Sequence, residues 1–241
     1  EATTLVSDAA KEAIHYLQKD YKRVMTPRFT ELEESRIAAL LSLFLEVDRN
    51  RVSFDILDQE KKYSWQHGDL KLTIKIDRID QLDNGALALI DYKTGKSAPR
   101  RESWLDERPE DMQLPFYFTV ASVQESAPVE ALAIAHVNVE KLQYSALAAT
   151  DNFLAKLKPV SQDPSFNTSW QALTELWQQR VHNLADEFIS GNAKVAPVNG
   201  DKTCLYCQFG PLCRINELNK SELSDDEDTT NTGPIFGGGD Y

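Results

Sequence analysis

The chain has 241 residues, of which 26 are Lys or Arg and 38 are Asp or Glu, and its formal net charge is −12. This length allows one large domain or two small ones with a sizeable core. The acidic balance argues against strong non-specific binding of nucleic acid by the whole surface. No apolar run is long enough to span a membrane, and no secretory signal peptide is present, so we expect a cytoplasmic protein without a membrane partner.

Hydrophobic periodicity predicts two helices followed by a group of strands. Apolar residues recur at helical spacing over 4–19 and 31–47. Three strand-like runs follow at 51–60, 70–77 and 87–93, and an Asn-Gly pair between the last two is typical of a hairpin turn. We therefore expect an antiparallel meander of three strands.

The next part of the chain alternates between strand and helix patterns. A polar loop at 94–108 precedes a predicted helix that runs from about 110 to 125 and an apolar strand at 130–140. This strand–helix–strand order predicts a crossover that adds a parallel strand. A long helix is predicted at 167–191, with Gly191 as its C-cap. The fold class is therefore α/β, with a mixed central sheet flanked by helices.

Composition divides the chain into three regions. We expect an incomplete N-terminal helical segment at 1–50, a core with a C-terminal cysteine segment at 51–216, and a disordered tail at 217–241. The tail is acidic and Gly-rich, with seven acidic residues and one Lys. Half of the net charge therefore lies outside the predicted core.

Two carboxylates and a lysine are predicted to meet on the meander. Asp91 and Lys93 are two positions apart on a strand and therefore share a face. Asp77 ends the neighbouring strand and lies about as far from the hairpin turn as Asp91, so the two should face each other. Carboxylates this close repel unless a cation intervenes, and a hard divalent cation takes oxygen ligands. Lys93 would then stabilise negative charge or hold a hydroxide. A structural Asp91–Lys93 salt bridge is the open alternative.

Three motifs in order resemble the PD-(D/E)XK nuclease superfamily, in its RecB-like and AddB-like branch. They are KIDRID at 75–80, LALIDYKTG at 87–95 and QLPFY at 113–117. The resemblance covers residues 30–216 and implies a restriction-endonuclease-like core with metal-dependent DNA exonuclease activity. It also implies a DNA repair and recombination protein that works with a helicase subunit or domain. No Walker A motif is present, so ATPase activity would lie elsewhere.

The resemblance assigns a role to each matching residue at the metal. Asp77 and Asp91 would bind Mg²⁺ or Mn²⁺, together with the backbone carbonyl of Tyr92. Lys93 would orient the attacking water and help to deprotonate it. Glu60, which we expect at the end of the preceding strand, is a weaker candidate for a further metal or water contact.

Further side chains are expected to bind the DNA substrate. Gln113 and Tyr117 are four positions apart on one helix face, and the resemblance implies that they position the substrate strand. A second set is basic, with one Trp that offers a stacking platform. This set is Arg78, Lys96, Arg100, Arg101 and Trp104. A solvated loop is the alternative interpretation for Arg100 and Arg101.

All three cysteines lie within one short segment. Cys204, Cys207 and Cys213 have the spacing C-x2-C-x5-C, which suits a zinc or iron–sulfur site better than a disulfide scaffold. The spacing resembles the C-terminal triplet of AddB-like nucleases, where an upstream Cys completes a [4Fe–4S] cluster. No Cys precedes Cys204, so we expect the cluster to be incomplete in this chain.

Two other functions remain open at this point. The chain is alternatively a catalytically silent DNA-binding or scaffolding module of a helicase–nuclease complex, or a zinc-binding interaction domain built on the cysteines. The intact set of Asp77, Asp91 and Lys93 favours the enzyme. We expect the chain to depend for activity on an upstream helix that the family carries before its first strand.

Overall fold

The structure is a computed structural model that describes residues 2–95, 99–213 and 215. It divides into two compact units, Glu1–Gly191 and Asn192–Tyr241. Among the described residues, no helix is both long and apolar enough to cross a membrane.

The first unit begins with two helices that pack on each other. These are α1 (Ala2–Gln18) and α2 (Pro27–Arg49). The Thr26 side chain accepts a hydrogen bond from the backbone N–H of Phe29 and so caps α2, and Pro27 occupies the first turn, where no backbone N–H is required. Both predicted helices are therefore present, and α2 begins earlier than its apolar periodicity indicated.

Five strands form one mixed sheet in the order β1-β2-β3-β4-β5. They are β1 (Phe54–His67), β2 (Leu70–Leu82), β3 (Leu87–Lys93), β4 (Val129–Asn138) and β5 (Lys141–Ala148). Only the β3–β4 pair is parallel. The predicted meander and crossover strand are confirmed. The fifth strand was not predicted, and β1 and β2 extend beyond their predicted ends.

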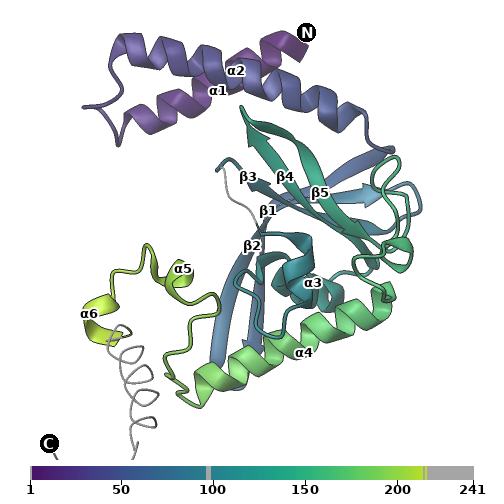
Figure 1. The fold of residues 1–241 in the computed structure, drawn as a ribbon. Coiled ribbons are helices and arrows are strands. Elements are labelled where there is room, and N and C mark those ends of the chain that lie inside the picture. The colour runs from purple at the N-terminus through teal and green to yellow at the C-terminus, as the bar shows by residue number, and fades with distance from the viewer. Residues whose placement is uncertain (1, 96–98, 214, 216–241) are drawn as a thin grey trace, which may run out of the picture. The chain divides into compact units, whose positions relative to one another are not determined.

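Helices cover both faces of the sheet (Figure 1). On one face, α3 (Gln113–Gln124) and α4 (Trp170–Ile189) pack against side chains such as Leu89 and Leu132. On the other face, α2 contributes Phe44 to a cluster built on the small side chains of β4. The predicted α/β fold class is confirmed, and the shorter helical turns are η1 (Arg101–Leu105), η2 (Val160–Gln162), α5 (Asp201–Cys204) and α6 (Gly210–Cys213).

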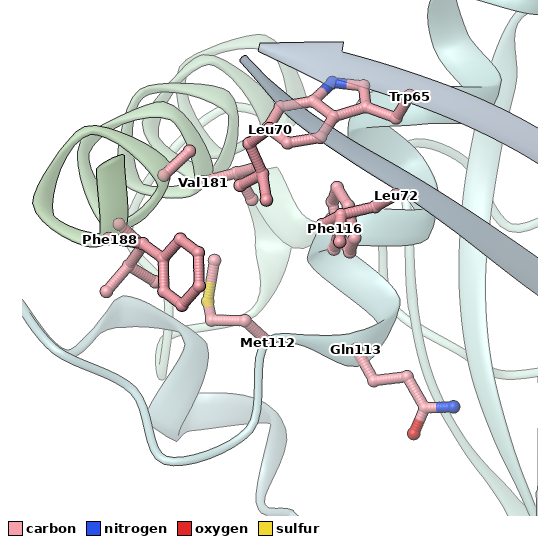
Figure 2. Close-up of a pocket in the computed structure, with 10 residues that line it drawn as sticks. Trp65, Leu70, Leu72, Met112, Gln113, Phe116, Val181 and Phe188 are labelled. Atoms are coloured by element: carbon pink, nitrogen blue, oxygen red, sulfur yellow. The ribbon is translucent and has the colours of Figure 1, made fainter. Parts of the chain in front are cut away.

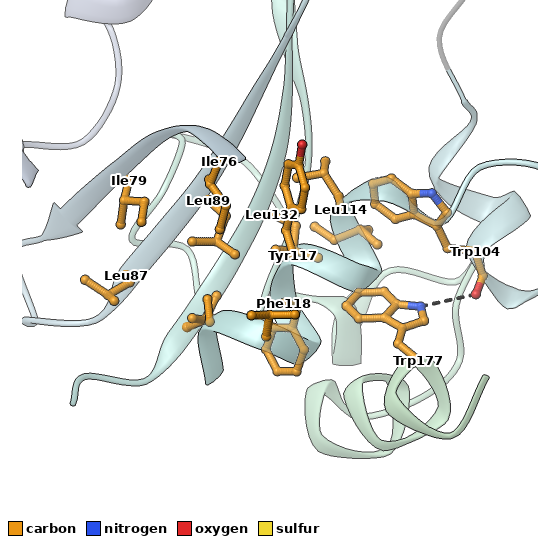
Figure 3. Packing of buried hydrophobic residues seen from close by; sticks show 14 of the residues in the cluster. Ile76, Ile79, Leu87, Leu89, Trp104, Leu114, Tyr117, Phe118, Leu132 and Trp177 are labelled. Carbon is orange, nitrogen blue, oxygen red and sulfur yellow. Dashed lines mark hydrogen bonds between the residues drawn. The ribbon is translucent and has the colours of Figure 1, made fainter. Parts of the chain in front are cut away.

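The core between the sheet and α4 contains two perpendicular indole rings (Figure 3). Trp104 and Trp177 have ring centroids 6.0 Å apart at an interplanar angle of 88°, and Trp177 Nε1 donates to the backbone oxygen of Trp104 at 3.2 Å. Both rings are fully buried. Trp104 is therefore a core residue, and the prediction that it offers a stacking platform to DNA is wrong.

The second unit contains α5 and α6, which carry the cysteine segment. The predicted disordered tail at 217–241 lies outside the described residues.

Candidate active site

Asp77 and Asp91 lie side by side on β2 and β3. The antiparallel register pairs Arg78 with Ile90, which places Asp77 opposite Asp91 as expected from their distances to the turn. The backbone N–H of Tyr92 donates to Asp77 Oδ2 at 2.9 Å. The Asp77 carboxylate is therefore directed toward β3.

The alternation of β2 shifts by one position next to Asp77. Ile74, Ile76 and Ile79 all pack in the core on the α3 and α4 side, so strict alternation is interrupted between Ile76 and Ile79. On β1, Glu60 occupies the position opposite Asp77 and has a positive φ of 53°. Irregular strand positions of this kind re-aim side chains and are common beside active sites.

A hydrogen-bonded polar cluster joins β3 to the first turn of α3. Lys93 Nζ lies 2.8 Å from Asp91 Oδ2 and donates to Gln113 Oε1 at 2.6 Å. Gln113 Nε2 lies 2.7 Å from both Asp91 Oδ1 and the Tyr117 hydroxyl oxygen. Asp111 accepts the Gln113 backbone N–H at 2.8 Å and so holds the start of the helix. The structure thus brings together four of the residues that the resemblance assigned to the metal, the attacking water and the substrate strand.

Burial and neighbouring charges set the electrostatics of this cluster. Burial raises the pKa of Asp91, and the negative charges of Asp77 and Asp111 add to this effect although Lys93 opposes it. Burial alone would lower the pKa of Lys93, but the hydrogen bond and charge of Asp91 outweigh it and raise that pKa. Burial also raises the pKa of Tyr117. Lys93 therefore carries its proton in this arrangement.

The oxygens available here match a hard divalent cation. Two adjacent carboxylates whose charges repel are the donor type that Mg²⁺ and Mn²⁺ prefer. Across the described residues, no group of three or more His, Cys, Asp and Glu side chains is placed to hold a metal. A metal at Asp77 and Asp91 would therefore complete its coordination with backbone, water or substrate oxygens, as is common for Mg²⁺.

Glu60 differs from its predicted position. It lies within β1 and not at the end of the strand, and its carboxylate forms an ion pair with Lys75. Its place opposite Asp77 keeps it near the site, but Lys75 already neutralises its charge.

The Arg78 side chain is buried and does not lie on the surface that was predicted to bind DNA. Its guanidinium donates to Asp80 Oδ1 at 2.6 Å, to Asp48 Oδ2 at 3.0 Å and to the Tyr92 hydroxyl at 3.1 Å. Only 6% of its side chain is exposed. The prediction for Arg78 is therefore wrong, because its side chain points toward α2 and joins a buried ion network.

The other predicted DNA contacts have mixed outcomes. Arg101 donates to the backbone oxygen of Ala146 at 2.8 Å and lies 3.5 Å and 3.8 Å from the carboxylates of Glu102 and Asp163, so its charge is largely compensated. Arg100 is exposed, and Lys96 lies outside the described residues.

Sequence reasoning missed the residues that surround Arg78. Asp48 comes from α2, and the Tyr144 hydroxyl of β5 donates to it at 2.7 Å, while Arg51 contacts both Asp48 and Asp80. These residues are far apart in the sequence and match no motif. Nothing in the sequence indicated that these charged side chains are buried, because Asp and Arg are usually exposed.

An apolar pocket of about 320 Å³ borders the polar cluster (Figure 2). Its lining includes Trp65, Met112, Phe116 and Phe188, with Gln113 at its edge. Gln113 therefore belongs both to the rim of this pocket and to the hydrogen-bonded cluster around Asp91.

All three cysteines lie in the second unit. Cys207 is exposed, and Cys204 and Cys213 are partly buried. In the described part of the chain they do not form a ready-made metal site.

Comparisons with known proteins place the chain in a family. The model of the PD-(D/E)XK nuclease superfamily matches residues 1–214. A candidate exonuclease from Eubacterium rectale is 14% identical, with 98% of this chain and 77% of that chain covered and a TM-score of 0.43. The protein SSO0001 is 15% identical, with coverages of 86% and 84% and a TM-score of 0.34. No curated protein matches the sequence. The mixed five-stranded sheet is the α/β core expected of the matching family, and the chain belongs to the PD-(D/E)XK nuclease superfamily.

Proposed function

We propose that this chain is the metal-dependent DNA exonuclease domain of a RecB/AddB-like repair and recombination protein, with a helicase subunit or domain as its partner. The observation that carries the proposal is the cluster of Asp91, Lys93 and Gln113 beside Asp77. This cluster combines a pair of hard oxygen donors with a protonated amine on one sheet face. A cytoplasmic location is part of the same proposal.

Asp77, Asp91 and the Tyr92 carbonyl are the proposed metal ligands. The Tyr92 N–H points toward Asp77, and in a paired extended strand the C=O of the same residue points to the same side. This direction supports a ligand set of these three oxygens between β2 and β3. A bound Mg²⁺ or Mn²⁺ supplies Lewis acidity and lowers the pKa of water.

Lys93 orients the attacking water and stabilises charge on the phosphoryl oxygens. Asp91 and Gln113 fix its ammonium group from two sides, which reduces the reorganisation needed when charge develops. Gln113 accepts from Lys93 through Oε1 and donates to Asp91 through Nε2, and therefore acts by positioning these two side chains. Tyr117 accepts from Gln113, and its own proton remains available to a phosphate oxygen of the substrate.

The test is digestion of end-labelled linear DNA, single-stranded and double-stranded, with Mg²⁺ or Mn²⁺. The wild-type chain should release nucleotides from the ends. Asp91→Asn and Lys93→Ala should each lower the rate by about 100-fold or more, the usual cost of removing one electrostatic or acid–base group. Asp55→Asn is the matched control, because Asp55 is an exposed carboxylate on β1 outside the cluster.

Two results would contradict the proposal. Equal rates in Asp91→Asn and Asp55→Asn would mean that the cluster is not catalytic. No digestion by the wild type, including a longer protein with its natural upstream sequence, would favour the silent DNA-binding module.

We also propose that Cys204, Cys207 and Cys213 supply three ligands of a [4Fe–4S] cluster in the parent protein. Their spacing supports this assignment, and the fourth ligand would come from outside this chain. Iron analysis and visible absorbance of the longer protein test it, since bound zinc without visible absorbance would contradict it.

A further inference from the structure

A second polar group lies on the sheet face that carries the active site. Leu132 and Ile134 of β4 pack on the α3 and α4 side, so His136 follows them on the same face. In the parallel register His136 pairs directly with Lys93. His136 is therefore the neighbour of the catalytic lysine on the next strand.

The adjacent strand extends this group. On β5, Leu147 packs on the α3 and α4 side and Tyr144 on the α2 side, which places Lys141 and Ser145 on the active-site face. Lys141 Nζ and Ser145 Oγ each lie 3.1 Å from His136 Nε2. Adjacent strands are about 4.8 Å apart, so β5 lies about 10 Å from β3.

Lys141 differs from several other lysines of the chain in the kind of group that its ammonium contacts. Lys61, Lys75 and Lys93 each form an ion pair with a carboxylate. In the part of the chain that the structure describes, the ammonium of Lys141 contacts the imidazole of His136 and no carboxylate. Burial and the charge of Lys141 both lower the pKa of His136, so the imidazole is neutral and accepts hydrogen bonds at Nε2. The cation therefore remains available to an anion from outside.

We propose that Lys141, His136 and Ser145 form a second phosphate subsite that holds a non-scissile phosphate of the substrate strand. The inference rests on the proposed nuclease function. A nucleic-acid strand carries a phosphate about every 3.4 Å of helix axis, so a strand whose scissile phosphate lies at Lys93 places another one within reach of β5. Lys141 supplies the charge and two N–H donors beyond the one directed at His136, and His136, held in turn by the Ser145 hydroxyl, keeps the ammonium in place.

The first test measures binding of a fluorescent single-stranded oligonucleotide in EDTA, where metal-dependent cleavage cannot occur. The affinity is followed as a function of NaCl concentration for the wild type, Lys141→Ala and Lys158→Ala. Loss of one phosphate contact should reduce the slope of log K against log salt by about 0.7 in Lys141→Ala. Lys158 is an exposed lysine after β5 whose neighbour Leu157 packs on the α2 side, so Lys158→Ala should leave the slope unchanged.

The second test measures steady-state cleavage with metal. Lys141→Ala should raise KM several-fold with little change in kcat, because the subsite contributes equally to ground-state and transition-state binding. Lys141→Gln, which keeps most of the side-chain stem, should show the same change if lost charge is the cause.

Each outcome separates the two proposals. A wild type that binds and cleaves DNA, with Lys141→Ala equal to Lys158→Ala in slope and KM, would overturn the subsite and leave the nuclease proposal intact. A wild type that binds the oligonucleotide with the predicted change in slope, but cleaves nothing, would overturn only the nuclease activity. Absence of any binding would overturn the subsite directly.

Discussion

The buried ion network beside the active site should make Asp80 the most sensitive charged position in the first unit. Its carboxylate accepts from Arg78 Nε at 2.6 Å, Arg78 Nη2 at 3.0 Å and Arg51 Nη1 at 2.7 Å. None of the Asp80 or Arg51 side chain is exposed. Asp80→Asn keeps the shape of the side chain and removes its charge, so two buried guanidinium groups would share the single carboxylate of Asp48.

The expected cost follows from the loss of charge balance. Breaking a buried ion pair by removing one partner costs about 3–5 kcal/mol, because the remaining charge stays desolvated. A domain has only about 5–15 kcal/mol of unfolding free energy, so Asp80→Asn should lose about a fifth of it or more. Asp58→Asn is the control, since Asp58 pairs with Lys61 with 38% of its side chain exposed and should lose about 1 kcal/mol at most.

Urea unfolding followed by circular dichroism measures both variants. The midpoint should fall sharply for Asp80→Asn at an unchanged m-value. A double variant, Asp80→Asn with Arg51→Met, restores the balance and also removes two Arg51 nitrogens that have no hydrogen-bond partner among the described residues. It should therefore be more stable than the sum of the two single changes predicts. Additive losses, or an Asp80→Asn cost no larger than that of Asp58→Asn, would refute the reasoning.

Three further predictions concern the surroundings of the site and the core. Tyr92→Phe removes the hydroxyl that Arg78 contacts, next to the backbone of the proposed metal ligands, and should raise the Mn²⁺ concentration for half-maximal activity several-fold. Tyr144→Phe, in the same ion network but without a link to the proposed ligands, should leave that concentration unchanged, and equal values for the two variants would contradict the prediction. Trp177→Ala should cost about 3–5 kcal/mol in urea unfolding, because it empties a fully buried site; a cost below about 1 kcal/mol would mean that the core is not packed as described. Burial opposes ionisation of Asp48, but the Tyr144 hydrogen bond and the arginine charges outweigh it and lower its pKa. Stability from Asp48 is therefore present above its ordinary pKa and lost as the pH falls through its lower folded value, so Asp48→Asn should flatten the acid limb of stability against pH.

The local patterns that predicted the meander depended on short-range geometry. Alternation along 70–77 and the Asn-Gly turn determine which residues can pair, and they placed Asp77 opposite Asp91 correctly. The fifth strand was missed although Lys141–Ala148 alternates between polar and apolar residues, and its apolar face is buried only because the segment pairs with β4.

Residues that were assigned wrongly share one physical cause. Arg78 and Trp104 have side chains suited to binding DNA, but the structure buries both, in an ion network and in an aromatic core respectively. Chemical type says what a side chain can bind. The layer that packs on each face of the sheet decides whether DNA can reach it.

The sequence by itself determined that Asp91 and Lys93 share a face and that Gln113 and Tyr117 share another, because strand and helix periods are local. Only the tertiary structure brought these two faces into one hydrogen-bonded cluster, since the contact between β3 and α3 depends on the crossover and on packing of the core. The same packing placed His136 beside Lys93 and Lys141 beside His136, across strands whose order and direction no single segment encodes.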